Sequence, residues 1–252
     1  MPGKRNIFWW IPNSITSLSI VCGVLATFFA IDGHLGLAGI FIIAASVFDF
    51  LDGFAARLLN TYSEMGKQLD SLGDVISFGV APAAILFTLL EFSLFGKNQP
   101  IYEIEGKWYE WVILFSAFLI PVFSALRLAK FNIDPEQSSN FKGLPTPANA
   151  ILWASFGIIL QFPEHADLLK LIFTTKNLVI ISIITSLLLV SGIPMFSLKL
   201  KNLRWGNNWY RYLFLFFSIL MGAFLTVYAI PLIIIFYILL CFIFYLFKVE
   251  FR

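Results

Sequence analysis

The chain is dominated by a series of apolar runs that are long enough to cross a lipid bilayer. A helix needs roughly 18 to 25 mostly apolar residues to span about 30 Å of hydrocarbon, and helices satisfy all of their own backbone hydrogen bonds there. Eight runs are candidates, at 14–31, 35–59, 70–95, 108–131, 147–162, 178–198, 210–228 and 231–247, of which the fifth is short. The sequence therefore predicts an all-α, polytopic transmembrane helix bundle of about eight spans.

Composition and charge fit a membrane protein. Hydrophobic residues make up 59% of the 252 residues, charged residues 13%, and the mean hydropathy is +0.85, values outside the range of soluble globular domains. The formal net charge of +2 gives no electrostatic argument for nucleic acid as a partner. No soluble domain, long linker or internal repeat interrupts the runs, which predicts a single integral membrane domain over residues 1–252.

The ends of the chain and its basic residues predict the orientation in the membrane. Residues 7–11, with two tryptophans after Lys4 and Arg5, suit a short N-terminal interfacial segment, and the first run reads as a retained span rather than a cleaved signal. Lysine and arginine concentrate on the side that holds both termini, whereas the other side holds Lys97, Lys107, Lys170 and Lys176. The positive-inside rule then places both termini and the loop after the second span in the cytoplasm of an inner-membrane protein.

Four aspartates stand inside this apolar sequence at helical spacings. Asp49 and Asp52 are three residues apart, and Gly53 continues the same helix face. After a short turn at residues 60–64, Asp70 and Asp74 recur at a spacing of four, again on one face. Two antiparallel helices joined by a short loop turn these faces toward each other, so we expect the four carboxylates to converge at the inner membrane boundary.

Such a cluster requires positive charge, because an ionised carboxylate at membrane depth is costly. Oxygen ligands without a paired histidine or cysteine favour Mg²⁺, Mn²⁺ or Ca²⁺ over zinc. Four carboxylates are enough to hold two such ions. The competing interpretations are solvated carboxylates at helix ends, or a cation pathway through a transporter. A transporter would spread its carboxylates through membrane depth on several helices, whereas these lie on two adjacent helices.

The full pattern D-x-x-D-G-x-x-A-R-x8-G-x3-D-x3-D runs from Asp49 to Asp74 and resembles the signature of the CDP-alcohol phosphotransferase family of membrane enzymes. The resemblance implies displacement of CMP from a CDP-linked lipid by an alcohol, with two divalent ions (Mg²⁺ or Mn²⁺). It also implies a homodimer. The implied metal ligands are Asp49, Asp52, Asp70 and Asp74, with Asp74 also the general base. The implied CDP-binding residues are Asp52, Gly53, Arg57 and Gly66.

Segments on either side of the motif narrow the choice of the acceptor alcohol. "LDSLGDVISFGVAPA", "SALRLAKFNI", "FKGLPTPANA" and, near the N-terminus, "PNSITSLSIVCG" look like those of the membrane-type phosphatidylserine synthases in this family. The resemblance covers about residues 1–150, the expected catalytic core, and leaves 151–252 as additional transmembrane helices. In the N-terminal segment, Asn13 and Thr16 recur at the corresponding place in such enzymes, but capping of the first span explains them equally well.

Serine brings a carboxylate and an ammonium group, so its pocket needs a cation beside the aspartates. Arg127, Lys130 and Lys142 are the serine-binding candidates, and the apolar neighbours of Arg127 indicate that its charge faces the bundle interior. The stiff stretch 143–147 is a candidate wall of the same site. The expected reaction joins CDP-diacylglycerol and L-serine. Glycerol 3-phosphate, inositol or inositol phosphate remain alternative acceptors.

Overall fold

The structure is a computed structural model that describes residues 10–61, 63–133, 141–162, 164, 166–197 and 205–248. In chain order its elements are α1 (Trp10–Ile31), α2 (Leu35–Leu58), α3 (Glu64–Val75), η1 (Ile76–Val80), α4 (Ala81–Phe95), η2 (Ile101–Glu103), α5 (Trp108–Phe115), η3 (Ser116–Phe118), α6 (Leu119–Ile133), β1 (Phe141–Lys142), α7 (Thr146–Ile159), α8 (Ala166–Ile172), α9 (Thr175–Val190), β2 (Pro194–Met195), α10 (Trp205–Leu225), η6 (Thr226–Tyr228) and α11 (Ala229–Leu246).

The predicted all-α class is confirmed for the described residues, where strand pairing is limited to the short antiparallel contact of β1 with β2. Five helical stretches are long and apolar enough to cross a membrane, as expected of an integral membrane protein. They are Trp10–Ile31, Leu35–Leu58, Glu64–Phe95, Trp108–Ile133 and Asn208–Leu246. Helices α7 and α9 are apolar but shorter, so the count of eight spans stays a prediction. Most of the expected interfacial segment, residues 7–9, lies outside the described residues.

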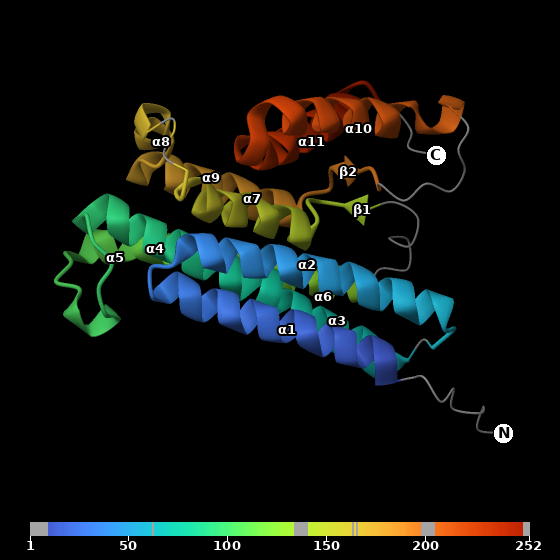
Figure 1. Cartoon of the computed structure of the whole chain (residues 1–252), viewed down its shortest axis with the longest axis horizontal. Helices are drawn as coiled ribbons and strands as arrows, with labels where there is room; N and C mark the ends of the chain where they lie inside the picture. The colour runs from blue at the N-terminus through green and yellow to red at the C-terminus, as the bar shows by residue number, and fades with distance from the viewer. Residues whose placement is uncertain are drawn as a thin grey trace.

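The last long stretch is a pair of antiparallel helices. The chain reverses at η6, where Thr226 has a positive φ of 49°, and α11 returns alongside α10 (Figure 1). The rings of Phe214 and Phe236 stack across the pair, with centroids 6.1 Å apart. Stretch Asn208–Leu246 is therefore two helices, in agreement with the two separate runs read from the sequence.

Helices α1, α2, α4 and α7 form the main core, and α2 and α7 approach closely at glycines. A β-carbon added to Gly39 would lie 2.5 Å from the carbonyl oxygen of Ala154, and one added to Gly157 would lie 2.4 Å from that of Leu35. Small residues allow such close backbone contact between membrane helices. This contact fixes α7 against the helix that carries Asp49.

The substitution Gly157→Ala is expected to destabilise the protein by about 1–3 kcal/mol, the usual cost of overpacking a tight contact. Thermal unfolding in detergent should show a lower midpoint for this variant. Gly222→Ala is the matched control, because a β-carbon on this α10 glycine meets nothing within 4 Å. Equal midpoints for the two variants would contradict a backbone contact at Gly157.

A π-helical segment, η1, follows the helix that carries Asp70 and Asp74. The backbone N–H of Ala81 donates to the carbonyl oxygen of Ile76, five residues earlier, where an α-helix would use a spacing of four. The Ser77 hydroxyl donates to the carbonyl oxygen of Ser19 at 3.0 Å, and Gly79 lies against Pro121 of α6. The segment is thus held between α1 and α6, immediately after the aspartates.

A second core cluster joins β2, α10 and α11 to the rest of the bundle. Phe196 lies at its centre, with its ring against those of Tyr210, Phe214 and Tyr237. The buried Tyr237 hydroxyl donates to the carbonyl oxygen of Phe196 at 2.9 Å. Helix α11 also packs against α7, so the C-terminal pair adjoins the helix that lies beside the acidic cluster.

Candidate active site

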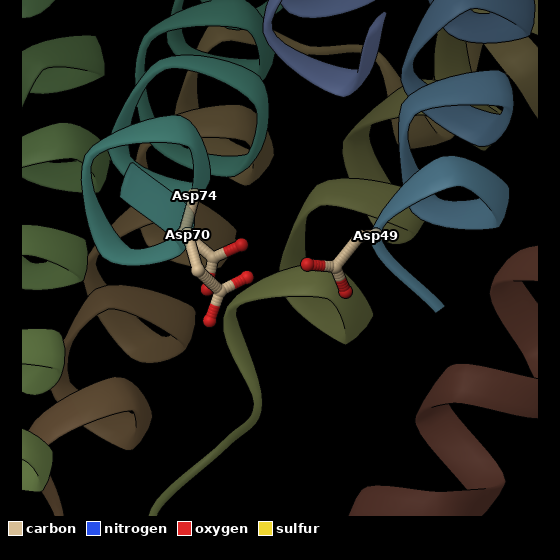
Figure 2. A group of neighbouring side chains, drawn as sticks. All are labelled: Asp49, Asp70 and Asp74. Carbon is tan, nitrogen blue, oxygen red and sulfur yellow. The ribbon is translucent and has the colours of Figure 1, made fainter. Parts of the chain in front are cut away.

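Three of the four predicted carboxylates come together in the structure. Asp49 extends from α2, and Asp70 and Asp74 extend from α3; one oxygen of each lies within 4.8 Å of the others. Figure 2 shows the two α3 side chains directed toward Asp49, with the first turn of α7 beside them. All three are partly buried. The short connection between α2 and α3 brings the two acidic faces together, as the spacing predicted.

The cluster needs more positive charge than the neighbouring side chains supply. In the described part of the chain, no lysine or arginine nitrogen lies within 4.0 Å of these three carboxylates. Like charges at this separation repel one another strongly in a partly buried site. Carboxylate oxygens are the ligands that Mg²⁺ and Mn²⁺ prefer. The donor set therefore fits a divalent ion.

Asp52, the fourth carboxylate, lies outside this group of three. It is 6% exposed, and its Oδ2 accepts a 2.6 Å hydrogen bond from the Thr16 hydroxyl of α1. Thr16 lies well inside α1, so the capping role considered for it does not apply. Asp52 lines a pocket together with Asp70, and its assignment as a metal ligand stays a prediction.

The pocket beside the acidic cluster has a volume of about 550 Å³, within the usual range for small-molecule sites. Helices α1, α2 and α3 and the connection between the last two form its walls. Its lining residues are Pro12, Asn13, Thr16, Asp52, Gly53, Ala56, Thr61, Ser63, Glu64, Gly66, Lys67 and Asp70. One side of this pocket is thus acidic, and its floor comes from the residues of the predicted motif.

Both motif glycines line the pocket. A β-carbon on Gly53 would meet nothing within 4 Å, so the pocket is open at that point. A β-carbon on Gly66 would lie 3.0 Å from Asn13 Oδ1 and from Ser63 Oγ. Ser63 also caps α3 by accepting from the Gly66 N–H at 3.0 Å. The absence of side chains at both glycines leaves room for a ligand to approach the backbone.

The predicted basic residues differ in placement. Arg57 is exposed on the last turn of α2 and is not among the residues that line the pocket. Lys130 and Lys142 are exposed as well. Arg127 is 8% exposed, in agreement with its apolar neighbours, and its charge interacts with the carboxylate of Asp74. The binding roles predicted for these four residues stay predictions.

The family model of CDP-alcohol phosphatidyltransferase matches residues 9–187, which is more than half of the chain and includes every predicted site residue. The chain belongs to the CDP-alcohol phosphatidyltransferase family. The match ends before α10 and α11, so the C-terminal helix pair lies outside the part that the family model describes.

The curated relatives of this chain are similar to one another in name. A CDP-diacylglycerol–serine O-phosphatidyltransferase of Mycobacterium tuberculosis is 33% identical over 205 residues, 77% of this chain and 63% of the relative. One of Bacillus subtilis is 33% identical over 162 residues, 64% of this chain and 81% of the relative. An archaetidylserine synthase of Methanothermobacter thermautotrophicus is 33% identical over 155 residues. The matched part spans less than two thirds of the mycobacterial relative.

Sequence reasoning gave Lys67 no role at this CDP-alcohol phosphatidyltransferase site and left Thr16 as a possible cap. Thr16 bonds Asp52 across 36 positions, and Lys67 lines the pocket next to Gly66. The spacing of the aspartates carries no information on α1, and Lys67 was counted only toward orientation. Two signals pointed to Thr16: its recurrence at the corresponding place in the resembling enzymes, and its polar side chain inside the first apolar run, which is also common at helix starts.

Proposed function

We propose that the protein transfers the phosphatidyl group of CDP-diacylglycerol to the hydroxyl of L-serine, giving phosphatidylserine and CMP. The observation that carries the proposal is the cluster of Asp49, Asp70 and Asp74 beside a pocket lined by the two motif glycines. Family membership supports the CDP-linked donor. The names of the relatives support serine as the acceptor.

Asp49, Asp70 and Asp74, with Asp52 as the fourth ligand, would hold two divalent ions, Mg²⁺ or Mn²⁺. When bound, these ions supply positive charge opposite the diphosphate and its departing CMP. Gly53 and Gly66 leave space for the nucleotide part of the donor. Arg57 would reach the phosphates from the rim, where a planar guanidinium suits phosphate oxygens.

The reaction exchanges one phosphorus–oxygen bond for another. The serine hydroxyl oxygen forms a bond to the phosphorus that carries diacylglycerol, while the bond from that phosphorus to the oxygen of CMP breaks. Asp74 accepts the hydroxyl proton as attack proceeds, because a serine hydroxyl is too weak an acid to ionise beforehand. The bond electrons leave with CMP, so no oxidant or further reactant is needed.

The placement of the pocket suits a donor that stays in the bilayer. Phe50, Phe54 and Leu58 of α2 are exposed apolar residues on the helix that carries Asp49, so acyl chains can remain among membrane lipids while the CDP group occupies the pocket. We infer eight passes from the apolar runs. The distribution of basic residues supports a cytoplasmic position for both termini and the active site of this inner-membrane protein. A homodimer remains part of this proposal, as the family resemblance implies.

An acceptor panel tests the function directly. Purified protein with CDP-diacylglycerol and Mg²⁺ is expected to release CMP rapidly with L-serine and only at the background rate with glycerol 3-phosphate, inositol or inositol phosphate. For glycerol 3-phosphate and inositol phosphate the physical reason is charge, because a phosphate-bearing acceptor requires a denser basic cluster than one buried arginine provides. Faster CMP release with any of the other acceptors would replace serine in the proposal.

A further inference from the structure

Buried polar atoms without a hydrogen-bond partner occur on the two helices that flank the acidic cluster. On α7 they are Thr146 Oγ1, both amide atoms of Asn149 and the indole Nε1 of Trp153; on α6 they are Ser124 Oγ and Arg127 Nε. Thr146, Asn149 and Ser124 are all 0% exposed. Buried polar atoms in folded proteins nearly always have a partner. A side-chain amide with two donors and an acceptor that makes no bond therefore indicates a missing ligand.

Four of these residues form two pairs, one on each helix. Thr146 and Asn149 are three apart on α7, and Ser124 and Arg127 are three apart on α6, so each pair shares a helix face. Both helices pack against η1, the segment that follows Asp74. Ser124 lies against Gly79 of η1, and the charge of Arg127 interacts with Asp74. Figure 2 shows the first turn of α7 beside the acidic cluster.

We infer that Thr146 and Asn149, together with Arg127, bind the amino-acid end of the acceptor; this inference rests on the proposed function. A zwitterion needs donors for its carboxylate and acceptors for its ammonium group. Arg127 and the amide nitrogen of Asn149 supply donors. The amide oxygen of Asn149 and the hydroxyl of Thr146 supply acceptors. One cation among neutral polar groups matches an acceptor without net charge, whereas an acceptor phosphate would leave the amide oxygen of Asn149 without a donor.

The test measures Michaelis constants for each substrate in single variants of the full chain. Asn149→Leu and Thr146→Val remove the polar atoms with little change in volume. Loss of a hydrogen bond to a charged group corresponds to roughly a ten- to 150-fold weaker binding. We therefore expect each variant, and Arg127→Ala, to raise the constant for serine by about tenfold or more while the constant for CDP-diacylglycerol changes little.

Ser155→Ala is the matched control. Ser155 is on the same helix and is also 0% exposed, but its hydroxyl already donates to the Leu152 carbonyl oxygen at 2.6 Å. The Michaelis constant of Ser155→Ala for serine should equal that of the wild type. An unchanged constant for serine in both Asn149→Leu and Thr146→Val, or a rise confined to CDP-diacylglycerol, would overturn the inference.

A second measurement does not depend on turnover. In the presence of Mg²⁺ and CDP, L-serine should raise the midpoint of thermal unfolding of the wild type and of Ser155→Ala, and this shift should be lost in Asn149→Leu. A retained shift would overturn the inference even if activity fell. Failure of the proposed function is distinguishable, because the wild type itself would then release no CMP in response to serine.

Discussion

Chelation of divalent ions with EDTA is expected to reduce CMP release to the background rate, and added Mg²⁺ or Mn²⁺ should restore it. The reason is the group formed by Asp49, Asp70 and Asp74, whose oxygens lie within 4.8 Å of one another and form no ion pair with a lysine or arginine of the described residues. A diphosphate substrate would add negative charge to the same place, so binding and reaction both require a cation. The assay is CMP release from CDP-diacylglycerol and L-serine in detergent.

The control for this experiment is EDTA already saturated with Mg²⁺, which should leave the rate unchanged. Asp49→Asn is expected to raise the Mg²⁺ concentration needed for half-maximal activity, since it removes one anionic ligand. Full activity of the wild type in excess chelator would exclude metal-dependent chemistry at the acidic cluster. The predicted ligands would then have to be reinterpreted as carboxyls that position the substrate.

Asp74→Asn is expected to lower turnover at least about 10²-fold, the usual scale for loss of a general base. Asparagine has nearly the same shape as aspartate but cannot accept the hydroxyl proton. Asp74 is the residue of the cluster whose charge interacts with Arg127, and Arg127 is the proposed contact for the acceptor carboxylate. This placement sets Asp74 on the side of the cluster nearest the acceptor.

The comparison with Asp49→Asn separates a base from a ligand. Affinity for CDP-diacylglycerol should survive better in Asp74→Asn than in Asp49→Asn, where ion binding itself is impaired. The affinity for CDP-diacylglycerol and the affinity for Mg²⁺ both follow from CMP release measured at varied concentrations of each. An equal loss of donor affinity in the two variants would mean that Asp74 acts only as another ligand.

The sequence was sufficient to predict the helical class and the meeting of Asp49 with Asp70 and Asp74. Spacings of three and four fix which residues share a helix face, and a short connection fixes which faces meet. The same logic could not separate Asp52 from the other three. Its partner, Thr16, belongs to a helix with no periodic acidic pattern, and the 2.6 Å bond between them depends on how α1 packs against α2.

The residues proposed to hold serine were only partly visible in the sequence. Arg127 was identifiable because a charge within an apolar run must face the protein interior. Asn149 and Thr146 carry no charge and match no metal or nucleotide pattern. Their significance comes from burial without a hydrogen-bond partner, which is a property of packing. The reversal at η6 was, in contrast, readable from the break between two apolar runs.

The π-helical segment η1 has a further consequence for how the family's aspartates tolerate change. A π turn is equivalent to one residue inserted into an α-helix, and each helical residue turns the chain by about 100°. If these same residues adopted regular α-helical hydrogen bonding, α3 would be rotated by about that angle relative to α4. Asp70 and Asp74 would then point away from Asp49 although all three carboxylates were still present. The π hydrogen-bonding pattern of this one turn therefore sets the direction in which Asp70 and Asp74 point. The site depends on that direction as well as on the identity of the acids.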